Sequence, residues 1–150
     1  VVQLMVEKGV YLVPTLAAPH FIIKNGVEAG IPVSAVEKSK MVMGDHMASF
    51  RKAYEAGVKI AMGTDSGTPF NPHGSAPVEL NLMVENGMTI MDAIVSATKN
   101  ASELLGIDNN YGTLEEGKFA DFLVLDENPL DNLDTLFNIN EVYKLGKLVK

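Results

Sequence analysis

A single carboxylate, Asp65, lies in a short glycine-rich loop that directly follows an apolar run. The segment GVKIAMGTDSGTPFNPHG, residues 57–74, carries this run at Val58–Met62. In α/β folds the carboxyl ends of parallel strands are where ligands bind and catalytic groups gather. Asp65 is therefore a candidate for contact with a ligand or for a part in catalysis. The alternative is a structural role, because the carboxylate of an Asp in a turn often accepts a hydrogen bond from a nearby backbone N–H. Here the donor would be one of the residues 66–68.

The three histidines are the other titratable candidates. His73 follows Asp65 by eight residues in the same loop, so it either contacts a substrate or bonds to the backbone. His20 is placed at the start of a long loop, where it either borders the site or is solvated. His46 lies on a predicted helix beside its apolar face, and we expect a boundary residue without a functional role. Thr15, at a strand end, is expected to be structural.

The elements that must position these residues alternate between strand and helix. Apolar runs predict strands at 10–16 and 58–62, and their continuous apolar character is typical of parallel strands buried on both faces. Residues 17–33 are expected to form a long loop. Periodic patterns predict helices over residues 1–8, 34–56, 76–86, 89–99 and 100–106. This alternation is typical of a parallel sheet with crossover helices.

Short-range signals mark where these helices begin. The pairs that predict amino-terminal caps are Ser34 with Glu37, Thr89 with Asp92, and Asn100 with Glu103. The first residues, VVQLMVEKGV, have neither an initiator Met nor such a cap, and they read as the last turns of a helix. Two buried-type strands also need neighbours that this sequence does not supply. We therefore expect a segment of a longer chain.

The pattern changes near residue 108. Residues 109–150 are rich in turns and predict a small β module, with a strand at 122–125 and a hairpin formed by 141–144 and 147–149. Asp121 is expected to fix a turn before the first of these strands. The expected division is therefore 1–108 for the α/β part and 109–150 for the β module.

Composition narrows the class of function. The net charge is −7, with no long run of Lys or Arg, which argues against nucleic acid and anionic membrane surfaces as partners. There is no apolar stretch of membrane-spanning length. The sequence has no cysteine, so disulfides and thiolate ligands are excluded, and a reducing, cytoplasmic setting fits.

Four blocks together resemble the carboxyl-terminal third of the amidohydrolase superfamily. They are GVKIAMGTDSGTPFNPHG, GMTIMDAIVSATKNASELLGI, YGTLEEGKFADFLVLDENPL and KLGKLVK, in that order. The subgroup that is most similar is that of imidazolonepropionase-like and prolidase-like metal-dependent hydrolases. The resemblance implies an α/β fold: the carboxyl-terminal part of a distorted (β/α)8 TIM barrel, with strands 7 and 8 and their helices. Residues 109–150 would then be the carboxyl-terminal part of a small β-sandwich domain.

The resemblance also implies a chemistry. One or two divalent metal ions, expected to be Zn2+, sit at the mouth of such a barrel, and Asp65 matches the Asp after strand 8 that binds metal and shuttles a proton. His73 and His20 become candidate substrate contacts. The family's other ligands have no match in this sequence, so the 150 residues alone are expected to be inactive and to bind no metal tightly.

Three hypotheses follow. The first is a metal-dependent hydrolase of C–N bonds in a small-molecule amide, cyclic amide or dipeptide-like substrate, with this chain as part of it. The second is a non-catalytic assembly module that pairs with itself, as a homo-oligomer, or with the missing amino-terminal part of the barrel. The third is an independent small metalloprotein that uses His20, Asp65 and His73.

Overall fold

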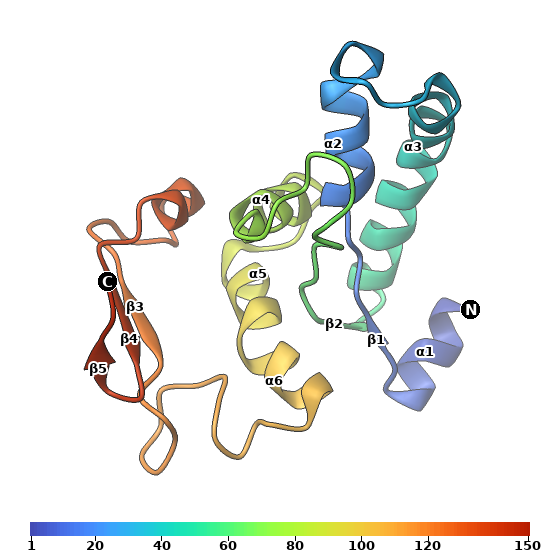
Figure 1. Cartoon of the computed structure of the whole chain (residues 1–150). Helices are drawn as coiled ribbons and strands as arrows, with labels where there is room; N and C mark the ends of the chain where they lie inside the picture. Colours follow the sequence, from blue (N-terminus) through green and yellow to red (C-terminus); the bar gives the residue numbers. More distant parts are fainter.

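Two small sheets are separated by helices. The computed structural model describes residues 1–150. The helices are α1 (Val2–Lys8), α2 (Ala17–Asn25), α3 (Val33–Glu55), α4 (Ala76–Glu85), α5 (Ile90–Ala97) and α6 (Lys99–Leu105), with 3₁₀ turns η1 (Val27–Ala29) and η2 (Leu133–Phe137). The strands are β1 (Tyr11–Leu12), β2 (Lys59–Ile60), β3 (Phe122–Val124), β4 (Glu141–Lys144) and β5 (Lys147–Leu148). Figure 1 shows α4, α5 and α6 between the pair β1–β2 and the sheet β3–β5.

The first sheet is the predicted parallel pair, shorter than expected. Tyr11 lies opposite Lys59 and Leu12 opposite Ile60, in parallel register. Beyond this point the second apolar run leaves the ladder, because the N–H of Met62 donates to the carbonyl of Ser96 in α5 at 3.0 Å. β1 and β2 each have one strand neighbour. The parallel arrangement is confirmed, whereas the predicted spans 10–16 and 58–62 are too long.

The expected loop at 17–33 is wrong, since most of it is helical. α2 begins at Ala17, and Pro19 falls in its first turn, where a missing N–H costs no helical hydrogen bond. The helix start is capped from a distance: the carboxylate of Glu79 in α4 accepts from the N–H of Leu16 at 2.9 Å and of Ala17 at 2.6 Å. The prediction failed because no residue near 17 in sequence supplies this cap.

One of the three predicted caps is confirmed. The Thr89 hydroxyl accepts from the N–H of Asp92 at 3.1 Å, at the start of α5. The cap expected from Ser34 with Glu37 is wrong, because α3 begins at Val33 directly after Pro32 and has no side-chain cap. α6 is preceded by Thr98 rather than capped by Asn100, whose side chain is used elsewhere.

A single apolar core joins the first strands to helices α2–α5. Its most deeply buried large members are Leu16, Phe50 and Met83. The remaining members are Ala17, Ala53, Val58, Ile60, Leu80, Leu82, Met88, Ala93 and Leu133. Burial of this kind of apolar area supplies most of the drive to fold. The core therefore holds β1 and β2 against α3 on one side and α4 with α5 on the other.

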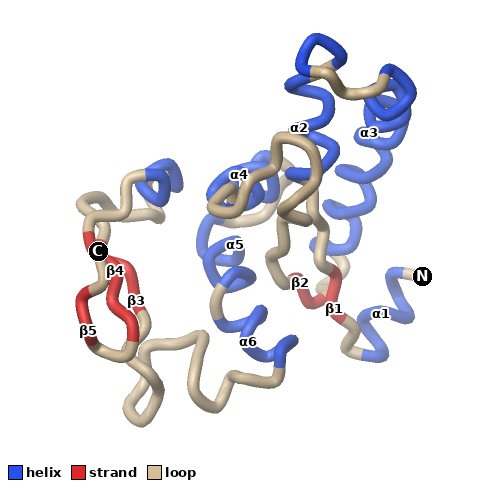
Figure 2. Tube along the Cα trace, viewed as in Figure 1, coloured by secondary structure: helices blue, strands red, loops and turns tan.

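The second sheet is antiparallel, in the order β3–β4–β5. The β4–β5 turn has Leu145 and Gly146 at positive φ, 51° and 74°, as a two-residue hairpin requires. Asp121 fixes this turn rather than the expected one before β3: its carboxylate accepts from the N–H of Leu145 at 2.7 Å and pairs with Lys144. The backbone bond from Leu145, together with Lys144, lowers the pKa of Asp121. Figure 2 shows that the connection between α6 and β3 is mostly loop.

None of the helices is at once long enough and apolar enough to cross a membrane.

Candidate functional site

The carboxyl ends of β1 and β2 approach each other closely. A Cβ atom on Gly63 would lie 2.5 Å from Cγ1 of Val13 and 3.9 Å from Cγ2 of Thr15, so only glycine fits there. Each strand then ends in a turn with a non-glycine residue at positive φ: Thr15 at 50° and Asp65 at 54°. Such backbone is unfavourable for residues with a side chain and is often kept at functional sites. The two turns therefore define the candidate site.

The Asp65 side chain is exposed and has no hydrogen-bond or salt-bridge partner within the chain. The Asx turn that the structural alternative expects is not formed. The backbone carbonyl of Asp65 takes its place as the acceptor, from the N–H of Thr68 at 3.3 Å and from its hydroxyl at 3.0 Å. The turn is thus closed without the carboxylate, which is left available for another group.

Sequence reasoning missed Asn71, which lies beneath the Asp65 turn. Its side chain is buried and donates to the carbonyl of Thr64 at 2.5 Å and to that of Asp65 at 3.1 Å. Its amide oxygen accepts from the hydroxyl of Ser75 at 2.6 Å. A buried amide with every polar atom partnered stabilises one backbone conformation. The only sequence signal was an Asn six residues after Asp65 in a loop that is otherwise rich in Gly and Pro.

Glu79 was also missed, and it holds the other turn. Its side chain is fully buried in α4, with its two oxygens on the N–H groups of Leu16 and Ala17, directly after Thr15. Burial raises the pKa of Glu79 to about 7, although the two N–H donors oppose this rise. The start of α4 is therefore tied to both strand-end turns: Glu79 bonds directly after the first, and Ser75, the residue before the helix, reaches the second through Asn71.

The histidines are not brought together with Asp65 as a ligand set. His73 is exposed and forms no hydrogen bond within the chain. His20 lies in the first turns of α2 rather than in a loop; its ring meets Phe21 edge-on at 5.6 Å, and burial lowers its pKa. His46 is a boundary residue, and its ring nitrogen contacts the carbonyl of Pro14 at 2.7 Å.

The residues present do not make a complete metal site. No three His, Cys, Asp or Glu side chains converge on a point where an ion could be held. A catalytic zinc needs about three protein ligands. Asp65, exposed and unpaired, has the right donor atoms for one of them. The third hypothesis, a small metalloprotein built on His20, Asp65 and His73, is therefore not supported.

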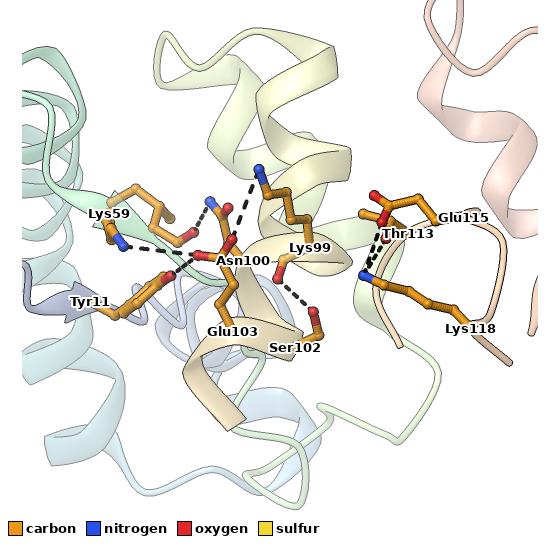
Figure 3. Close-up of polar contacts among 10 residues, drawn as sticks. Tyr11, Lys59, Lys99, Asn100, Ser102, Glu103, Thr113, Glu115 and Lys118 are labelled. Atoms are coloured by element: carbon orange, nitrogen blue, oxygen red, sulfur yellow. Dashed lines mark hydrogen bonds and ion pairs between the residues drawn. The ribbon is translucent and has the colours of Figure 1, made fainter. Parts of the chain in front are cut away.

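A second polar cluster lies at the opposite, amino-terminal end of the strands (Figure 3). The hydroxyl of Tyr11 donates to Glu103 at 2.6 Å, while Lys59 and Lys99 each approach its carboxylate at 3.9 Å. The side chain of Asn100 donates to the carbonyl of Ile60 at 2.8 Å. The expected capping pair of α6 instead ties that helix to β1 and β2. The bond to Glu103 raises the pKa of Tyr11 to about 12, so the Tyr11 hydroxyl keeps its proton and remains a donor to Glu103.

A large hollow lies away from Asp65. It has a volume of about 920 Å³ and is lined mainly by apolar side chains of α4, α5, α6, β3 and the connection between α6 and β3. Neither Asp65 nor any of the three histidines lines it. The hollow therefore does not belong to the candidate site at the strand ends.

Comparison with known proteins gives consistent results. A model of the amidohydrolase family matches residues 1–149. Ochratoxinase of Aspergillus niger is 36% identical over 99% of this chain and 31% of its own length. Imidazolonepropionase of Fusobacterium nucleatum is 38% identical over 70% of this chain and 26% of its own. The crystal structure of a Xaa-Pro dipeptidase with methionine in its active site superposes with a TM-score of 0.90 at 41% identity, covering 99% of this chain and 36% of that one. The chain thus spans about a third of the length of the relatives it matches.

Proposed function

The chain belongs to the amidohydrolase family, and from this premise we propose that it forms the carboxyl-terminal part of a metal-dependent hydrolase of C–N bonds. In this proposal β1 and β2 are the last two strands of a (β/α)8 barrel. The observation that carries it is the exposed Asp65 carboxylate at the carboxyl ends of two parallel strands, without a partner in its own chain. The remaining ligands would come from outside these 150 residues.

Asp65 has two tasks in the proposed reaction. Asp65 would serve as one ligand of a divalent ion, for which we propose zinc, and that ion when bound would supply an activated water and polarise the scissile carbonyl. Asp65 also accepts a proton from the attacking water and passes it to the departing nitrogen. The C–O bond forms first; the C–N bond then breaks as Asp65 gives the proton to the nitrogen, so the amine leaves neutral.

The proposed substrate is a small amide, with a dipeptide favoured. The support is the likeness to the Xaa-Pro dipeptidase, at 41% identity over nearly the whole chain. His73 and His20 remain proposed substrate contacts. His73 is the better placed, because it is exposed in the same loop as Asp65, whereas the ring of His20 is partly buried against Phe21.

A second candidate, an assembly function, is favoured by one observation. β1 and β2 each have a free edge, and unpaired edges tend to pair with another strand. We propose that these edges pair with the rest of the barrel in the enzyme. In its absence they would pair with a second copy of this chain.

The test of the catalytic proposal is Asp65→Asn in the complete enzyme. The substitution keeps the shape and removes the proton shuttle, so turnover should fall by about 10²–10⁴-fold. The matched control is Asp108→Asn, because Asp108 is an exposed loop carboxylate with no hydrogen-bond partner. Steady-state hydrolysis of a dipeptide series measures both variants. Near-normal turnover of Asp65→Asn would show that Asp65 is only a turn residue.

A further inference from the structure

We propose that Asn71 is the positioning residue of the site: it holds the backbone of Asp65 in the conformation that presents the carboxylate. The inference rests on the proposed function, because it assumes that Asp65 is the catalytic carboxylate. It concerns a residue that forms no hydrogen bond with the Asp65 side chain and acts through the backbone.

The first step is the geometry of the Asn71 amide. Its nitrogen reaches three acceptors of the Asp65 turn: the Thr64 carbonyl at 2.5 Å, the Asp65 carbonyl at 3.1 Å and the Thr68 hydroxyl at 3.2 Å. The side chain is 1% exposed, so no water replaces these bonds. Two consecutive carbonyls directed at one donor define the orientation of both peptide planes around Asp65.

The second step is the closure of the loop. The N–H of Gly67 donates to the carbonyl of Asn71 at 3.0 Å, and the N–H of Asn71 donates to the carbonyl of Thr68 at 3.0 Å. Asn71 is therefore bonded to the turn through its backbone as well as its side chain. Among the polar side chains of the loop from Thr64 to Asn71, only the Asp65 carboxylate has no partner within the chain.

The third step ties this unit to the rigid part of the fold. Ser75 is buried at the start of α4, and its hydroxyl donates to the amide oxygen of Asn71 at 2.6 Å. This bond sets which side of the amide faces the Asp65 turn, because it requires the oxygen to point at Ser75. The Asp65 backbone is thus held in a fixed position relative to α4, which packs in the core.

Asp65 needs such a support because of its backbone conformation. Asp65 has φ of 54°, a conformation that an L-residue leaves readily when nothing holds it. Relaxation to negative φ would rotate the Cα–Cβ bond and move the carboxylate. Misplacement of a reacting group by about 1 Å can cost about 10²-fold in rate. The support therefore acts on turnover and not on substrate affinity.

The experiment compares three variants of the complete enzyme. Asn71→Asp keeps the shape but replaces the donor by an acceptor facing two carbonyls. Ser75→Ala removes only the hydroxyl that orients the amide, and it adds no titratable group. The matched control is Asn86→Asp: Asn86 is also buried, at the opposite end of α4, where its amide donates to the Leu82 carbonyl at 2.8 Å.

The measurements are kcat and KM for one dipeptide and the melting temperature. For Asn71→Asp we expect kcat to fall by about 10–10²-fold with KM nearly unchanged. Ser75→Ala should lower kcat less, in the same direction and again with KM nearly unchanged. Asn86→Asp should lower the melting temperature without changing kcat.

The outcomes that overturn the inference are distinct from failure of the proposed function. If Asp65→Asn abolishes turnover while Asn71→Asp and Ser75→Ala keep normal kcat, Asn71 is only structural and the catalytic assignment stands. If the loss of kcat in Asn71→Asp is no larger than that in Asn86→Asp at equal loss of melting temperature, the inference is also refuted. Should Asn71→Asp not fold, Ser75→Ala decides the matter by whether its kcat falls while its KM stays nearly unchanged. Normal turnover of Asp65→Asn would remove both proposals.

Discussion

Replacing Glu79 by glutamine should make the stability of the protein much less dependent on pH between about pH 5 and pH 8. Glu79 is fully buried, and its carboxylate faces only the N–H groups of Leu16 and Ala17. Burial disfavours the charged form by more than these two donors favour it. The pKa is raised from 4.5 to about 7 in the folded protein.

The sign of the effect follows from proton binding. Between the unfolded and folded pKa values the unfolded chain has released the Glu79 proton, whereas the folded protein keeps it. The free energy of unfolding therefore falls as the pH rises through this window, and the fall is complete once the pH exceeds about 7. A rise of about 2.5 pKa units, at 1.36 kcal/mol for each, corresponds to about 3 kcal/mol.

The assay is urea denaturation of the purified protein across this pH range. The Glu79→Gln variant has no titratable group at this position, so its plot of unfolding free energy against pH should lose the part of the slope that Glu79 causes. A constant shift of the whole plot caused by the amide does not affect this comparison. The matched control is Glu85→Gln, since Glu85 is an exposed residue of the same helix α4, and it should keep the wild-type slope. If the curves for wild type and Glu79→Gln are parallel, burial of Glu79 does not control this pH dependence and the reasoning is wrong.

Three further predictions concern packing, metal binding and assembly. Gly63→Ala should destabilise by about 1–3 kcal/mol in the same assay, because its Cβ would lie 2.5 Å from Val13; Gly44→Ala, in a helix with open space around it, should not destabilise. Calorimetric titration of the isolated 150 residues with Zn2+ should show no site tighter than about micromolar, and a stoichiometric sub-micromolar site would contradict the proposal that further ligands are needed. Light scattering of the same chain should detect association through the free edges of β1 and β2, and a compact monomer at high concentration would contradict it.

The elements that sequence predicted well depend on neighbours within one turn of the chain. The end of α1 at Gly9 needs only a residue that tolerates φ of 62°. The start of α5 needs only the Thr89 hydroxyl and an N–H three residues later. The continuous apolar character of two short runs was enough to predict that they pair in parallel. The burial on both faces that this character also predicted is not seen, since Tyr11 and Leu12 are half-buried and Lys59 is exposed. Asp65 was selected as a candidate from its place after such a run.

The elements that failed depend on partners distant in sequence. α2 was taken for a loop because its cap, Glu79, lies 63 positions from Leu16. Asn100 and Glu103 have the spacing of a capping pair, yet they bond to Ile60 and Tyr11. In both cases the two groups are neighbours only because the core packs their elements together. A pattern of residues close in sequence does not contain that information.

The sequence by itself determined which residue types stand at the strand ends, and so it selected Asp65 as the candidate carboxylate. Only the tertiary structure decided how that carboxylate is presented. The positive φ at Asp65 persists because the buried amide of Asn71 donates hydrogen bonds to the backbone carbonyls on either side of Asp65. Ser75 orients that amide. These bonds matter because water is excluded from them, and burial is a property of the packed chain rather than of any short segment.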